Sequence, residues 1–273
     1  MMRAIGVSCV ALLLLAGASA ATPSQPLLDS GYRDMYNLNF PHAHSIFTEY
    51  ERAYPQDPLG HVSNAAAYLF SEFDRLRVLE FDLFTADSRF ESRPKASPDP
   101  AVKRSFDEEL AAGDAIANEQ LSKSPNDTNA LFALILANGL RGDYASLIEK
   151  RNFAGLSFMK SSRGLAERLL TLDPTCYDAY LAVGVENYLL GINAAPVRWI
   201  LRTTGAQTDK QQGIEKLKLT ATKGHYLAPF ARLLLAVAAM RDKDSNTARS
   251  LLQGLSTEFP QNNLYKKELA RIP

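Results

Sequence analysis

The pattern of apolar and polar residues is clearest near the end of the chain, between residues 229 and 262. Residues 229–240 are apolar on almost every side, which is typical of a helix that packs against more than one neighbour. A charged tetrapeptide, 241–244, interrupts this run. Apolar side chains then return at helical spacing in residues 247–259, and they are Ala248, Leu251, Leu252, Leu255 and Phe259. The stretch predicts two antiparallel helices closed by Pro260.

The same spacing occurs near the front of the chain. Residues 43–54 repeat the apolar intervals of the last hairpin, with Ala43, Ile46, Phe47, Tyr50 and Tyr54, and Pro55 then corresponds to Pro260. Further closing positions follow at Pro125, Pro174 and His225. The recurrence predicts a chain built from repeated helical hairpins.

We therefore predict an all-α stack of five hairpins. The paired helices are 27–38 with 41–53, a helix from residue 58 with 100–123, 128–141 with 156–172, 177–190 with 210–223, and 229–240 with 247–258. Long insertions are expected between the two helices of the middle three hairpins, at Arg75–Asp99, Gly142–Gly155 and Gly191–Asp209. Residues 266–271 are expected to form a short polar cap. The alternation of apolar and polar residues that predicts a strand does not persist in this sequence.

Two helices in about 34 residues resemble a tetratricopeptide (TPR) repeat. The motif's characteristic positions are matched in the fourth and fifth hairpins by Tyr180, Val183, Gly184, Ala236, Ala248 and Pro260. The chain resembles exported bacterial TPR proteins of unassigned role. The resemblance implies an α/α superhelical solenoid in which the first helix of each hairpin lines a concave face, and this face binds a protein or peptide.

The first residues have the pattern of an export signal. Arg3 provides a basic start, residues 10–16 an apolar core, and Ala18-Ser19-Ala20 a cleavage signal. The apolar core is shorter than the ~20 residues that span a bilayer, and no later stretch is expected to reach that length. We expect residues 1–21 to be a cleaved signal peptide and residues 22–273 to be a single soluble domain that spans no membrane. Its expected location is the bacterial periplasm or the exterior.

Composition and motifs exclude several classes of function. The 30 basic and 30 acidic side chains balance, and no run of like charge stands out, so we expect no nucleic-acid partner. No motif of a catalytic nucleophile, a phosphate-binding loop or a zinc protease occurs, so we expect neither an enzyme nor a cofactor. His42 and His44 point to different sides of a helix, while His61 and His225 stand alone, so no metal site is expected. After export Cys176 has no cysteine partner, and a small buried residue is the favoured interpretation.

Candidate binding residues come from the first helices and from the third insertion. They are Phe70, Phe132, Leu136, Leu181, Val185, Tyr188, Arg198, Trp199 and Arg202. Additional cations at the second insertion are Arg141, Lys150 and Arg151. We expect Trp199 to lie over the concave face.

Two interpretations of these residues remain open. The aromatic side chains form a dry core and the arginines a solvated helix face, or they line a binding groove with cationic groups at its mouth. In the second case the occupant is a protein partner of a scaffold. The alternative occupant is a small apolar or amphiphilic molecule, which the protein carries or senses under the inserted loops.

Overall fold

The computed structural model describes residues 25–80, 96–191 and 208–272. Within these ranges the elements are helices and turns, without a strand, so the predicted all-α class is confirmed. The helices are α1 (Gln25–Tyr36), α2 (Phe40–Ala53), α3 (Pro58–Arg75), α6 (Pro100–Lys123), α7 (Thr128–Asp143), α8 (Asn152–Leu172), α9 (Tyr180–Gly191), α11 (Lys210–Lys223), α12 (Ala228–Arg241), α13 (Ser245–Glu258) and α14 (Asn263–Arg271).

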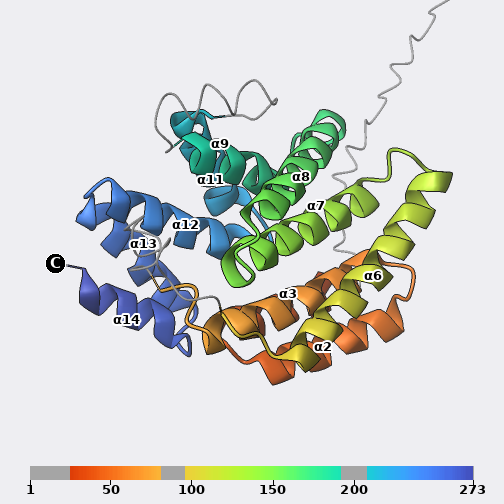
Figure 1. Ribbon diagram of the computed structural model, residues 1–273, viewed down its shortest axis with the longest axis horizontal. Helices are drawn as coiled ribbons and strands as arrows, with labels where there is room; N and C mark the ends of the chain where they lie inside the picture. The colour runs from red at the N-terminus through yellow and green to blue at the C-terminus, as the bar shows by residue number, and fades with distance from the viewer. Residues whose placement is uncertain (1–24, 81–95, 192–207, 273) are drawn as a thin grey trace, which may run out of the picture.

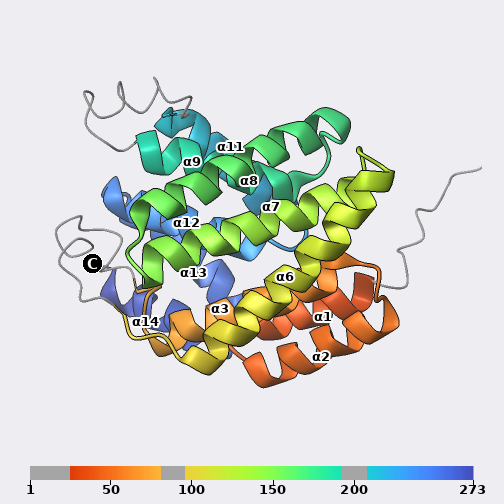
Figure 2. The ribbon, with the colours of Figure 1, turned by 45° about the vertical axis from the view of Figure 1, so that its right-hand side comes forward.

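The helices pair in sequence order. α1 packs with α2, α3 with α6, α7 with α8, α9 with α11, and α12 with α13. Each hairpin packs on the next through its second helix, and α14 packs on α13. In Figure 1 the chain runs from the orange α2 through α7 and α8 to the blue helices α12 to α14. Figure 2 shows α1 and α2 on the opposite side of the molecule from α9 and α11. The predicted order of five hairpins is confirmed.

Capping residues begin most of these helices. Asp57, Asp99, Asp127, Asp209, Asp244 and Asn262 each accept a hydrogen bond from a backbone N–H in the first turn of the helix that follows. Proline occupies the first turn of α2, α3, α6 and α12, where its missing N–H has no helical partner to lose. A polar cap stabilises a helix by about 0.5–2 kcal/mol. The helix starts are therefore determined locally.

Two glycines allow α9 and α11 to approach closely. A Cβ atom on Gly213 would lie 2.5 Å from the backbone nitrogen of Tyr188, and one on Gly184 would lie 3.0 Å from the backbone nitrogen of Leu217. Both distances are too short for a side chain without movement of a backbone. Gly184 thus has a packing reason to stand at the TPR motif position identified from the sequence.

The second predicted insertion, 142–155, is mostly helical, and its assignment as a long connection is wrong. A π-helical turn, Tyr144–Ile148, continues α7, and only residues 149–151 separate it from α8. Tyr144 is buried and its ring stacks on that of Phe106, with the centroids 5.1 Å apart. The apolar residues of this segment extend the third hairpin, because they pack into the core.

The extended helix changes one further expectation. Among the described residues, Thr128–Ile148 is long and apolar enough to cross a membrane by length and composition, although no such stretch was expected after the signal. Within the fold, 61% of its most apolar window is buried, and α7 packs against α3, α6 and α8. Such burial is typical of a core helix.

The first hairpin meets the last one, which the sequence analysis did not predict. The ring of Tyr32 in α1 stacks on that of Tyr226, just before α12, with centroids 4.7 Å apart. Tyr36 donates a hydrogen bond of 3.0 Å to the carbonyl of Tyr226, and the side chain of Asn262 donates one of 2.8 Å to the carbonyl of Tyr36. The stack of hairpins therefore turns back on itself.

The C-terminal helix takes part in this closure. α14 begins earlier than the predicted cap and buries Tyr265 and Glu268, so the prediction of a short polar cap needs correction. Lys267 and Arg271 pair with Glu80, just beyond α3. Figure 1 accordingly shows α14 returning toward the end of α3.

Substitution of Ala248 in α13 tests the predicted register of the helical repeat. Its side chain is fully buried, so Ala248→Leu is expected to overpack the site and lower the free energy of unfolding by about 1–3 kcal/mol. Gly254 on the same helix has open space around it, and Gly254→Ala is expected to raise stability by about 0.5–1 kcal/mol through helix propensity. Urea denaturation measures both. An unchanged midpoint for Ala248→Leu would contradict the packing.

Candidate binding surfaces

Phe70 lies at the centre of the closed stack. Its ring contacts those of Phe230 in α12 and Tyr36 in α1, with centroid separations of 5.5 and 6.1 Å. The side chain is half-buried. At this point the concave face is filled by the protein's own aromatic side chains, which come from three different hairpins.

The other described candidates divide between two cores. Phe132 is buried in the main core, and Leu136 packs on the same core. Leu181, Val185 and Tyr188 belong to a second, smaller cluster with Leu217 of α11 and Leu235 of α12. The structure does not bring these five side chains and Phe70 into one continuous groove. Their placement favours the core interpretation, and two separate hollows remain at the axis of the stack.

The cations expected at the mouth of the groove fall partly outside the described residues. Arg198, Trp199 and Arg202 lie outside the described residues. Arg141 makes two hydrogen bonds to Asp114 of α6, at 3.3 and 2.7 Å, and therefore serves the contact between hairpins. Arg151 pairs with Glu149 at 3.2 Å.

An aromatic hollow of about 390 Å³ lies between the end of α3 and the last hairpin. Its apolar wall is formed by α1, α3, α12 and α14, with Tyr36, Phe70, Phe73, Phe230 and Tyr265. Charged side chains form its edge, and they are Asp74, Arg75, Arg77, Glu80 and Lys267. This combination suits a molecule with an apolar body and a polar end.

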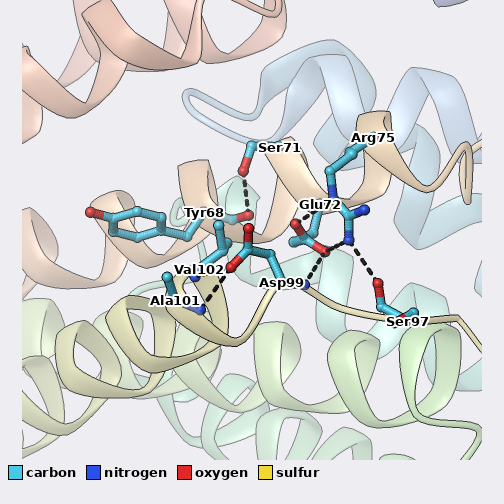
Figure 3. A network of polar contacts seen from close by, with 8 residues as sticks. All are labelled: Tyr68, Ser71, Glu72, Arg75, Ser97, Asp99, Ala101 and Val102. Carbon is cyan, nitrogen blue, oxygen red and sulfur yellow. Dashed lines mark hydrogen bonds and ion pairs between the residues drawn. The ribbon is translucent and has the colours of Figure 1, made fainter.

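A polar network fixes one edge of the aromatic hollow (Figure 3). The buried carboxylate of Glu72 accepts two hydrogen bonds from Arg75, at 2.8 and 2.7 Å, and one of 3.2 Å from the backbone N–H of Asp99. Arg75 also donates to the carbonyl of Ser97 at 2.8 Å. The network joins the end of α3 to the start of α6, so the two ends of the first insertion are held together.

A polar hollow of about 490 Å³ lies at the other end of the axis. Residues of the first four hairpins and of the segment before α12 line it, and several lie at or near the starts of α1, α3 and α7. The lining includes Gln25, Tyr50, Asp57, Thr128, Asn129, Phe132, Asp173, Cys176, Tyr177, Asp178, Lys223, His225 and Tyr226. Of the predicted site residues, only Phe132 is found here among the described ones.

Asp178 organises the wall of the polar hollow. Its carboxylate accepts three backbone hydrogen bonds of 3.0 Å, from His225, Tyr226 and Leu227, and so orients the segment before α12. Burial raises the pKa of Asp178 above its usual range, and the three N–H donors oppose that rise. Gly224 leaves room for this carboxylate, since a Cβ there would lie 2.6 Å from an Asp178 oxygen. The same segment carries Tyr226, which contacts α1.

Asp57 joins two hairpins on the opposite wall. One carboxylate oxygen accepts from the backbone N–H of Leu59 at 3.0 Å and from the side chain of Asn129 at 2.9 Å. The hydroxyl of Tyr50 donates to the other oxygen. The lining of the hollow is therefore held in place before any partner binds.

Cys176 also lines the polar hollow. Burial raises the pKa of its thiol to about 11, so the thiolate is scarce at neutral pH. This agrees with the interpretation of Cys176 as a packing residue.

Each histidine in the chain faces a polar partner. His42 lies 2.8 Å from Asp34, His44 lies 2.6 Å from Asn64, and His225 lies 2.6 Å from Asp29. His61 lies 2.7 Å from Glu109, with Glu51 also close. The prediction that His61 and His225 stand alone is wrong, because their partners are far away in sequence.

Removal of the Asp178 carboxylate tests its role at the polar hollow. Asp178→Ala leaves three backbone N–H groups without their acceptor, and an unsatisfied buried group costs about 1–3 kcal/mol. Asp178→Asn keeps one acceptor oxygen and is expected to lie between the alanine variant and the wild type. Thermal unfolding, monitored by circular dichroism, measures the order of the three unfolding midpoints. Equal midpoints for the wild type and Asp178→Ala would contradict this account.

Comparison with known proteins gives similarity to solved structures alone. No protein-family model matches the sequence, and no curated protein matches it. Among solved structures, the chain is similar to a thermophilic TPR protein of Thermus thermophilus, with 13% identity and a TM-score of 0.45. The alignment covers 91% of this chain and 98% of that one.

Proposed function

We propose that this protein is an exported scaffold that binds a protein or peptide segment at the polar hollow. The observation that carries the proposal is the construction of this hollow from the first four hairpins together with the segment that leads into α12. A surface assembled from so many segments has a shape only in the folded stack. It therefore provides a specific site rather than a general one.

The chemistry of the polar hollow suits a peptide. Phe132, Tyr177 and Tyr226 offer aromatic surface, which is enriched in protein interfaces. Hydrogen bonds from the backbone and hydroxyl of Thr175 lower the pKa of Asp173, so this side chain remains ionised as an acceptor for N–H groups. The ammonium group of Lys223 lies 4.9 Å from the centre of the Tyr177 ring and adds a cation to the lining. A chain segment with main-chain amides and both charge signs finds partners here.

The proposal assigns binding rather than catalysis to this site. Within the described lining, the Asp178 and Asp57 carboxylates are engaged by donors from the protein, and the Cys176 thiol is neutral at physiological pH. These groups hold the walls in place, which is what a recognition surface requires.

The aromatic hollow favours a second candidate function. Its volume of about 390 Å³ is within the range of about 300–1,000 Å³ that is typical of small-molecule sites. An amphiphile would place its apolar part against Phe70 and Phe230 and its polar end at the charged edge. This arrangement would make the protein a carrier or sensor.

Export is part of the proposal and has its own test. Expression of the full chain in a bacterium with an intact secretion system is expected to release residues 1–21 and place residues 22–273 in the periplasm. Mass spectrometry of the periplasmic protein measures the cleavage. A full-length chain that keeps Met1 and stays in the cytoplasm would exclude export while leaving the binding surfaces open to study.

Site-specific photo-crosslinking in cells distinguishes the two binding functions. A photoreactive residue at Thr128 probes the polar hollow and one at Leu264 the aromatic hollow, while Asn118, exposed on α6, is the control. The scaffold predicts a discrete protein adduct at Thr128 that is absent at Asn118. Lipid adducts confined to Leu264 would favour the carrier. Equal labelling at Thr128 and Asn118 would contradict a specific site at the polar hollow.

A further inference from the structure

Three potential metal ligands meet where the first two hairpins join, away from both hollows. Glu51 of α2, His61 of α3 and Glu109 of α6 each direct one donor atom to a common point, and these atoms all lie within 4.8 Å of one another. The nitrogen Nδ1 of His61 lies 2.7 Å from a Glu109 oxygen and 3.8 Å from a Glu51 oxygen. The side chains are 13–24% exposed, so an ion can reach them from solvent.

A buried amide orients the two carboxylates. Asn64 of α3 is 2% exposed, and its side-chain NH₂ group donates to Glu51 at 2.9 Å and to Glu109 at 3.0 Å. A carboxylate accepts only, so the Asn64 oxygen must face the other way. There it lies 2.6 Å from Nδ1 of His44, which must carry the proton. Outer hydrogen bonds of this kind fix the direction of ligands in metal sites.

The spacing of the donor atoms fits a small divalent ion. Zinc binds imidazole nitrogen and carboxylate oxygen at about 2.0–2.2 Å, and the ligand atoms of a tetrahedral site are then about 3.4 Å apart. The observed separations from His61, 2.7 and 3.8 Å, lie on either side of this value. Rotation of these side chains would bring the three donor atoms to the spacing that the ion requires.

We propose that Glu51, His61 and Glu109 bind one divalent transition-metal ion, with Zn²⁺ as the best match. The imidazole favours Zn²⁺ over Ca²⁺ and Mg²⁺, which prefer oxygen ligands. Three protein ligands leave a coordination position for water or for a group from a partner. The ion would connect α2, α3 and α6 and so stabilise the junction of the first two hairpins.

The ion would take the place of the hydrogen bond between His61 and Glu109. The hydrogen bond to Glu109 raises the pKa of His61, and Glu51 contributes in the same direction. Burial raises the pKa of Glu51, with Glu109 adding to the rise, while His61 and Arg52 lower it. The pKa of His44 is shifted in the opposite direction, because burial lowers it.

Calorimetric titration of the mature, tag-free protein with Zn²⁺ tests this site. We expect one ion per chain. Glu109→Gln and His61→Gln keep the size of each side chain and are expected to weaken binding about tenfold or more. His42→Ala is the matched control, because it removes a histidine that pairs with one carboxylate only, Asp34, and it is expected to bind as the wild type does.

Thermal unfolding provides a second measurement. Zn²⁺ is expected to raise the unfolding midpoint of the wild type and of His42→Ala, and Ca²⁺ is expected to have little effect. Circular dichroism confirms that each variant is folded, and Glu51→Gln replaces any variant that is not. The proposal is overturned if the wild type does not bind Zn²⁺. It is equally overturned if Glu109→Gln and His61→Gln bind as tightly as His42→Ala, because the cluster would then be an ion-paired contact between hairpins.

Discussion

The contact between the first and last hairpins is the constraint on which the rest of the structure depends. In an open solenoid, each repeat touches only its neighbours, and the concave face remains available along its length. Here Tyr32 and Tyr36 of α1 reach the segment before α12, and Tyr36 also meets Phe259, with ring centroids 5.4 Å apart. Aromatic pairs contribute about 0.5–1.5 kcal/mol beyond the burial of their area. Several such pairs hold the ends of the stack together.

The contact between the first and last hairpins determines where a ligand can bind. Once α1 lies against the last hairpin, Phe70 and Phe230 come together and form part of the wall of the aromatic hollow. The remaining space is divided into an aromatic hollow at one end and a polar hollow at the other. The two hollows differ in chemistry because they are formed by opposite ends of the same helices. The starts of α1, α3 and α7 and short polar segments line the polar hollow, while the ends of α1 and α3 and the start of α12 supply apolar rings to the aromatic hollow.

The local part of this architecture was predictable from the sequence, whereas the closure was not. Stripes such as Ala248, Leu252 and Leu255 identify each helix because their spacing repeats within a few turns. Asp57-Pro58 and Asp99-Pro100 are cap signals that would also have located the helix starts. By contrast, the stacking of Tyr32 on Tyr226 and the pairing of His61 with Glu109 join distant segments without any local period. The π-helical turn 144–148 was missed because an apolar segment between two helices has the same composition in an extended helix as in a packed connection.

Buried polar groups explain how the hairpins acquire the orientations that closure requires. An apolar interface tolerates small rotations, since hydrophobic burial is non-directional, but a buried amide or carboxylate tolerates few. Asn64 connects α2, α3 and α6. Glu72 joins the end of α3 to the start of α6, and Asp178 fixes the segment that enters α12. Each group acts at a different junction between hairpins or their helices. Because small angular errors add up around a ring, these directional contacts bring Tyr226 to the position where α1 can meet it.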